Sequence, residues 1–85
     1  TSRLMIFTNP STENNTNLVI KSSERGIFEI MVINTLGEIV LMDNVPVYKD
    51  LTQYQLDNSK LSNGIYNVII KTPSIQSSKK LQILR

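Results

Sequence analysis

The chain has 85 residues, of which 40% are apolar and 19% are charged, with a formal net charge of +2 at pH 7. This composition predicts a single globular domain over residues 1–85 with a small core. The absence of cysteine and histidine excludes disulfides, thiolate metal sites and histidine-based catalysis. The basic residues are spread from Arg3 to Arg85 without a stripe, so we expect no nucleic-acid partner.

Two strands are predicted before residue 26. Leu4–Thr8 is short and apolar, and Asn9-Pro10 ends it because proline donates no hydrogen bond to a neighbouring strand. Asn17–Ser22 follows a polar loop and places Leu18 and Ile20 on one face. We expect that face to be buried.

The longest alternating run, Ile27–Asn34, predicts a third strand. One of its faces carries Phe28, Ile30 and Val32, and the other carries Glu29, Met31 and Ile33. Asn34–Gly37 predicts a tight hairpin, because asparagine suits the first position of a type I turn and glycine suits the left-handed position after it.

The middle of the chain predicts two more strands. The fourth is predicted over Glu38–Met42, and Asp43–Asp50, which holds Pro46, is predicted to be a loop. The fifth strand is predicted over Leu51–Leu56, and Asp57–Asn63 is predicted to form a corner.

The stretch from Leu61 to Thr72 is the strongest fold signal. Gly64 can take a positive φ without a Cβ penalty, so a turn leading into a sixth strand is predicted here. Tyr66 is placed like the tyrosine corner of Ig-type sandwiches, in which the ring packs in the core and the hydroxyl bonds backbone a few residues upstream. Pro73 ends this strand, and Lys79–Arg85 predicts a seventh strand with Leu81 and Ile83 facing inward.

Seven short strands with turns every ~8–12 residues predict an all-β fold, an Ig-like antiparallel β-sandwich. The hairpins pair the third strand with the fourth and the sixth with the seventh. By analogy with Ig domains, the third strand lies beside the sixth, and the first, second and fifth strands form the opposing sheet.

The side-chain chemistry predicts neither an enzyme nor a cofactor site. The carboxylates are not spaced as a catalytic dyad, and without histidine or cysteine a triad or zinc site cannot be built in the usual way. Asp43, Asn44 and Asp50 could gather oxygen ligands around calcium, but they match no ligand spacing. We interpret them as solvated turn residues.

One predicted outer sheet face is apolar. If the third and sixth strands are neighbours, this face gathers Met31, Ile33, Ile65 and Ile69. An apolar sheet face normally needs a cover, so these residues form a candidate docking face or a dimer interface of the isolated domain. The alternative is that they are scattered and shielded by long side chains such as that of Lys71.

The predicted seventh strand also has two interpretations. Lys79, Lys80 and Arg85 would protect a sheet edge against aggregation. The same edge would alternatively serve as a handle for another protein, by strand addition or by capture of the basic end. The residues alone favour protection.

Four segments in this order resemble a known family. Phe7–Pro10 is similar to an opening Pro-Asn-Pro motif, and Asn34–Glu38 to a hairpin motif Asp-x-x-Gly-[Lys/Arg/Glu]. Leu56–Tyr66 resembles a corner motif that ends in Gly-x-Tyr, and Lys80–Arg85 a closing strand that carries lysine. The departures from the pattern are at Thr8, Asn34 and Asn58. From about Leu4 to Arg85 the chain resembles the type A C-terminal sorting domain of type IX secretion system cargo proteins.

The resemblance implies a secretion and sorting module that follows a cargo domain in one exported precursor. Its implied partners are the outer-membrane secretion machinery and a sortase-like cysteine peptidase, which cleaves upstream of the domain and attaches the cargo to anionic lipopolysaccharide. The implied location is the periplasm in transit and then the cell surface or the extracellular medium. The implied recognition residues are Lys79, Lys80, Leu81, Ile83 and Arg85, and the motif residues expected to hold the fold are Asn9, Pro10, Asn34, Gly37, Leu61, Gly64 and Tyr66.

The alternative function is that of an Ig-like adhesive or spacer module of a cell-surface protein. Such a module would carry a ligand site in its end loops, where Tyr48 and Tyr54 are the aromatic candidates for a glycan platform. Thr1–Arg3 does not look like a natural start, so under either hypothesis we expect a fragment of a longer protein.

Overall fold

The computed structural model describes residues 3–8, 15–57 and 59–83. Within them lie seven strands: β1 (Leu4–Thr8), β2 (Asn15–Ser22), β3 (Gly26–Ile33), β4 (Ile39–Val47), β5 (Leu51–Asp57), β6 (Gly64–Lys71) and β7 (Gln76–Ile83). The described part of the chain contains no helix that is long and apolar enough to cross a membrane.

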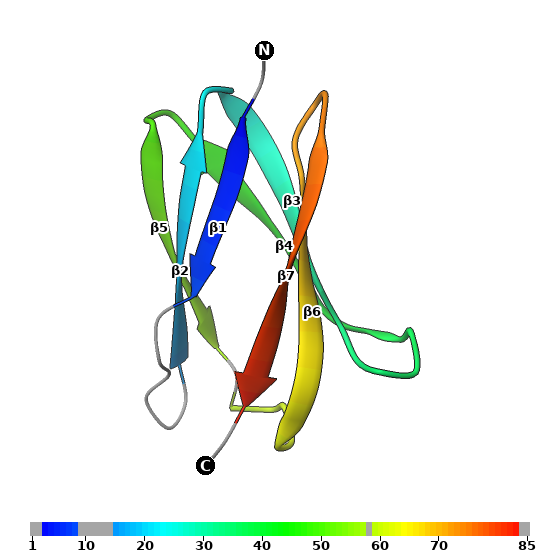
Figure 1. The fold of residues 1–85 in the computed structure, drawn as a ribbon. Helices are drawn as coiled ribbons and strands as arrows, with labels where there is room; N and C mark the ends of the chain where they lie inside the picture. The colour runs from blue at the N-terminus through cyan, green and yellow to red at the C-terminus, as the bar shows by residue number, and fades with distance from the viewer. Residues whose placement is uncertain (1–2, 9–14, 58, 84–85) are drawn as a thin grey trace.

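The strands form two antiparallel sheets that face each other as a sandwich (Figure 1). One sheet has the order β1-β2-β5 and the other has the order β4-β3-β6-β7, which confirms the predicted fold class and strand order. β1 and β7 belong to different sheets but lie side by side along one lateral side of the sandwich. Because β1 starts at one end of the sandwich and β7 finishes at the other, the two strands run in the same direction (Figure 1).

Alternating residues of both sheets fill the space between them. The inward positions predicted for β2, β3, β6 and β7 are all buried, which confirms the alternation. Burying each side chain of this size stabilises the fold by roughly 1.5–3 kcal/mol. The core consists of Ile6, Leu18, Ile20, Phe28, Ile30, Val32, Val45, Val47, Leu56, Leu61, Tyr66, Val68, Ile70, Leu81 and Ile83.

The predicted end of the fourth strand is wrong. β4 continues through Val47, so most of the predicted loop over Asp43–Asp50 is strand and Pro46 lies inside it. Among the described strands β4 pairs only with β3. An edge strand accepts proline because the missing N–H need not serve a second neighbour. The register with β3 also passes over Val40, which makes a β-bulge in the same edge strand.

β7 begins earlier than predicted. Its first residue is Gln76 rather than Lys79, because the polar segment Gln76–Ser78 pairs with Ile69–Lys71 of β6. This segment has little apolar alternation of its own, so its strand character comes from the neighbouring strand.

The hairpin between β3 and β4 confirms the predicted turn. The Gly37 N–H donates to the Asn34 carbonyl at 3.1 Å, and Gly37 takes a left-handed φ of 87°. The Asn34 Oδ1 accepts hydrogen bonds from the backbone N–H groups of Leu36 (2.9 Å) and Glu38 (3.0 Å). The Asn34 side-chain amide donates to the Glu38 carboxylate at 3.1 Å. One asparagine side chain therefore organises the whole turn.

The corner before β6 confirms the predicted tyrosine corner. The Tyr66 side chain is in the core, and its hydroxyl donates to the Ser62 carbonyl oxygen at 2.7 Å. Leu61, which precedes Ser62 in the chain, is also buried. Gly64 takes a φ of 156°, a conformation that residues with a Cβ rarely adopt. The corner thereby fixes where β6 starts, and through β6 it positions β7.

Candidate recognition surface along β7

β7 divides the predicted recognition residues into two groups. Leu81 and Ile83 are 4% and 0% exposed and lie opposite Tyr66 and Gly64 of β6. Lys80 is exposed on the outer face of the sheet, opposite Asn67. Arg85 lies outside the described residues. The apolar pair therefore fixes β7 in the core, while the lysine side chains are accessible to a partner.

Lys79 occupies a core-facing position in β7 yet is exposed. It alternates with Leu81 and Ile83 and lies in register with Val68, which is fully buried. A long side chain at a sheet edge can carry its ammonium group past the core into water. An inward-pointing charge of this kind disfavours pairing with a foreign strand. Lys79 and Lys80 thus present two ammonium groups from opposite faces of one strand.

The free edge of β7 has β1 beside it. Strand addition along the whole of β7 would therefore require β1 to move. Contacts to the lysine side chains would not require β1 to move, because these side chains project away from the backbone of β7. Side-chain contacts are the simpler way for a partner to read β7.

The four residues of the candidate docking face lie on neighbouring strands, but most are covered. Met31 pairs with Ile69 across β3 and β6 and is only 7% exposed. Ile33 and Ile69 are half-buried, and Ile65 is 42% exposed. The more exposed part of this face comes from β4, where Ile39 and Met42 are 52% and 56% exposed.

Sequence reasoning missed this contribution of β4. Ile39 lies opposite Ile33, and Met42 lies opposite Met31. The hairpin register, counted outward from the turn, could have placed Ile39, but the bulge at Val40 shifts the register and so a regular count does not place Met42 opposite Met31. The apolar face is therefore centred nearer to β4 than predicted.

The motif residues serve the turns. Asn34 and Gly37 make the hairpin, and Leu61, Gly64 and Tyr66 make the corner, as described above. Asn9 and Pro10 lie outside the described residues.

The three candidate calcium ligands do not converge, and their interpretation as turn residues is wrong for Asp43 and Asn44. These two are consecutive in β4, so their side chains leave the strand on opposite faces. Asp50 accepts a hydrogen bond from Arg25 at 2.5 Å in an exposed ion pair. Among the described residues, no group of three carboxylates could hold a metal ion.

Asp43 instead binds Tyr54 across the gap between the sheets. The Tyr54 hydroxyl donates to the Asp43 carboxylate at 2.5 Å. This bond and the Asn44 N–H lower the pKa of Asp43. Burial, followed by the neighbouring carboxylate, raises the pKa of Tyr54 above its usual range. Tyr54 therefore packs inward while Tyr48 is 75% exposed, and the two rings do not form an aromatic platform.

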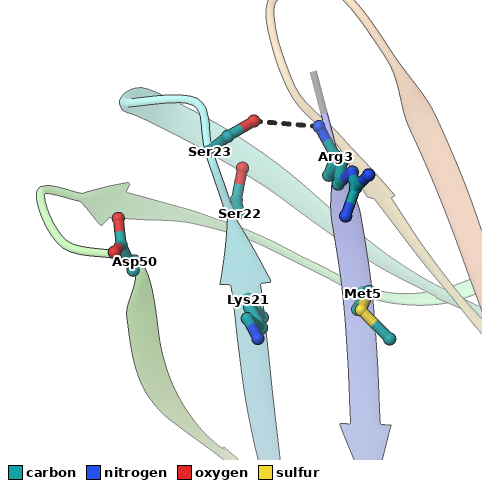
Figure 2. A pocket seen from close by; sticks show the side chains of 6 residues that line it. All are labelled: Arg3, Met5, Lys21, Ser22, Ser23 and Asp50. Carbon is teal, nitrogen blue, oxygen red and sulfur yellow. Dashed lines mark hydrogen bonds between the residues drawn. The ribbon is translucent and has the colours of Figure 1, made fainter. Parts of the chain in front are cut away.

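A pocket of about 220 Å³ opens where β1 begins (Figure 2). Its lining brings Arg3, Met5 and Lys21 together with the end of β2 and Asp50. The Arg3 N–H donates to Ser23 Oγ at 2.9 Å, and the Ser23 N–H donates to the Arg3 carbonyl at 3.2 Å. The chain is thus tied to β2 from Arg3 onward. The pocket walls combine two cationic side chains with an exposed methionine.

These features define an antiparallel β-sandwich on which Lys79 and Lys80 are exposed. Residues 5–84 match the family model described as secretion system C-terminal sorting domain. The chain belongs to this family, the C-terminal sorting signal domains of type IX secretion. No curated protein matches the chain.

Membership establishes the general role. The domain is a sorting signal, not a member of an enzyme family. It is part of a cargo precursor that interacts with the type IX secretion system and is exported across the outer membrane.

Proposed function

We propose that the outer-membrane machinery recognises the folded domain at β7. A sortase-like cysteine peptidase then cleaves upstream of β1 and attaches the cargo to the cell surface. The observation that carries the proposal is the family match over residues 5–84. The accessible Lys79 and Lys80, held on a strand whose other side is anchored by Leu81, support β7 as the recognition element.

The start of β1 supports cleavage before Arg3. A peptidase binds its substrate as an extended segment with free backbone groups. From Arg3 onward the backbone is paired with the end of β2. Cleavage within β1 would require this pairing to open.

The test is a transport assay. Residues 1–85 are fused behind an export signal and a fluorescent reporter in a cell with a type IX system, and surface and released reporter are quantified. We expect export that disappears when the translocon is inactivated. Deletion of the cysteine peptidase should leave the domain attached to exported reporter. Reporter that stays in the periplasm with a folded domain would overturn the proposal and favour the adhesive or spacer module.

Removing Leu81–Arg85 should block export, but the structure shows why this truncation is ambiguous. It deletes two buried side chains as well as the end of the strand. Ile83→Ala is the cleaner variant, because it should lower export only as far as it lowers the folded fraction. Growth at reduced temperature should then restore export, whereas loss of a direct contact would not be restored.

A further inference from the structure

The fold separates the charges of its strands by sign. The strands β1, β2, β6 and β7 contain no aspartate or glutamate, and their charged residues are Lys21, Lys71, Lys79 and Lys80. The strands β3, β4 and β5 contain no lysine or arginine, and their charged residues are Glu29, Asp43 and Asp57. Along the chain the three acidic residues lie between Lys21 and the other three lysines, so only the packing of the strands shows that Lys21 is on the same side as Lys79 and Lys80.

The two groups occupy different sides of the sandwich. β1 and β2 are neighbours in one sheet, β6 and β7 are neighbours in the other, and β1 lies beside β7 (Figure 1). The strands β2, β1, β7 and β6 therefore follow one another around one lateral side, and β3, β4 and β5 form the opposite side. Lys21 projects from the outer face of one sheet and Lys80 from the outer face of the other. We call these the basic side and the acidic side.

The lysines of the basic side are mostly uncompensated. Lys71 lies opposite Glu29, at the boundary between the two sides. Lys21, Lys79 and Lys80 form no ion pair with any residue in the described ranges. Arg3 adds a further cation to the pocket at the start of β1, which Lys21 and Asp50 also line (Figure 2). The Asp50 carboxylate is paired with Arg25.

Exposed apolar side chains lie among these cations. On β1, Met5 and Phe7 are 49% and 44% exposed, and Met5 pairs with Lys21 of β2. Apolar side chains would not contribute to binding a nucleic-acid backbone, because phosphate contacts come mainly from cationic and polar groups. Protein interfaces, in contrast, combine methionine and aromatic side chains with a charged or polar rim. The surface therefore suits a protein better than a polyanion.

We propose that the basic side, formed by Arg3, Lys21, Lys79 and Lys80, docks on a carboxylate-bearing protein surface of the secretion machinery. This proposal rests on the proposed function and names the chemistry of its partner. Separated charges orient a protein as it approaches a charged surface, and like charges exclude the reverse orientation. The acidic side would thus prevent the domain from docking backwards.

The test uses the full reporter fusion with matched charge variants. Lys79→Glu with Lys80→Glu should lower export by about tenfold or more, because it places like charges against the partner. Lys79→Arg with Lys80→Arg should export like the unchanged domain. The control is Lys49→Glu with Lys60→Glu, which changes the net charge equally but lies outside the basic strands. This control should also export normally, and thermal melting of each purified domain verifies folding.

The outcomes separate this inference from the proposed function. Translocon-dependent export of the unchanged domain tests the function alone. If that export occurs and the Lys79→Glu/Lys80→Glu variant is exported equally well, the inference is overturned together with the support that the two lysines give to β7, while the sorting function stands. A fall in export that is as large in the Lys49→Glu/Lys60→Glu control would also overturn it, because only net charge would then matter.

A suppressor selection identifies the partner class. Aspartate- or glutamate-to-lysine substitutions in a machinery subunit that restore export of the Lys79→Glu/Lys80→Glu variant would support an acidic protein surface. Suppressors confined to polysaccharide synthesis would overturn it. Self-association of the domain would also overturn it. In that case sedimentation at low salt would show association of the unchanged domain, and Lys79→Glu/Lys80→Glu would abolish both the association and export. In that case the acidic side of a second copy would be the partner.

Discussion

Two tyrosines hold two regions of this sandwich in different ways. At the corner before β6, Tyr66 is 6% exposed and its hydroxyl donates to a backbone carbonyl. Between the edges of β4 and β5, Tyr54 is only partly buried and its hydroxyl donates to the carboxylate of Asp43. The Tyr66 hydroxyl contacts the Ser62 carbonyl oxygen at 2.7 Å and the Ser62 hydroxyl at 3.4 Å, and neither ionises, whereas the Asp43 carboxylate that accepts from Tyr54 does.

The two contacts differ in how much they contribute to stability and in how that contribution depends on pH. The Tyr66 corner is built from buried apolar contacts, which depend little on pH or salt. The bond between Tyr54 and Asp43 joins the two sheets at an exposed edge, where solvent weakens charged interactions. We therefore expect the corner to contribute most of the stability and the exposed bond to contribute a small, pH-dependent part.

Removing the Tyr66 ring should have the largest effect. Tyr66→Ala empties a core position and should lower the free energy of unfolding by about 3–5 kcal/mol. In an 85-residue domain this is a large fraction of the total stability. Urea unfolding measures the loss, and Tyr54→Ala is the matched control with a smaller expected loss. Equal losses at the two sites would contradict the division between corner and edge.

Removing only the Tyr66 hydroxyl should have a moderate effect. Tyr66→Phe keeps the ring but leaves the Ser62 carbonyl without this donor. We expect a loss of about 1 kcal/mol in the free energy of unfolding. Because a carbonyl does not titrate, the loss should be the same at pH 4 and pH 7. A loss that changes between these two values would show that the corner is coupled to an ionisable group.

The tyrosine corner was predictable because its signals are local in the sequence. Gly64 and Tyr66 are two residues apart, and the alternation around them predicted which side chains are buried. The same holds for the hairpin, whose asparagine and glycine match the turn that the structure contains. Each of these features depends on neighbours within about four residues, which is the range over which turn chemistry acts.

The structure at the sheet edges was not predictable, because it depends on which strands become neighbours and not on residues that are close in the sequence. Pro46 would end the strand only if a neighbouring strand needed the N–H that proline lacks, and within the described residues β4 has no second neighbour. The contact between Tyr54 and Asp43 and the separation of charge into two sides likewise depend on which strands become adjacent. A lysine at a core-facing position, such as Lys79, also depends on β7 being an edge. Asn9, Pro10 and Arg85 lie outside the described residues, so the roles expected for them stay predictions.

The hairpin supplies an intermediate case between the two tyrosines. Asn34 is solvent-accessible like the Tyr54 site, yet its oxygen accepts from backbone N–H groups as a fixed part of the turn. Asn34→Ala should lower the free energy of unfolding by about 0.5–1 kcal/mol. In a Glu38→Gln background, which removes the carboxylate that an aspartate at position 34 would face, Asn34→Asp keeps both acceptor bonds and its loss should be smaller than that of Asn34→Ala. If both substitutions cost the same, the side-chain amide would be the important contact rather than the backbone bonds.

Tyr54→Phe should give the smallest and the most pH-dependent change. The lowered pKa of Asp43 means that the bond contributes above the ordinary aspartate pKa of about 3.9 and that this contribution is lost as the pH falls through the folded value. The raised pKa of Tyr54 means that the contribution is complete below the ordinary tyrosine pKa of about 10 and is lost as the pH rises through the folded value. The difference in unfolding free energy between the unchanged domain and Tyr54→Phe should therefore be greatest between about pH 5 and 9 and remain below about 1 kcal/mol, because the site is exposed. Urea unfolding across this range measures this difference. In an Asp43→Asn background, the decrease of the difference at low pH should disappear. A difference that is constant from pH 3 to 11 would mean that Tyr54 acts only through the packing of its ring, and the exposed edge would then resemble the buried corner.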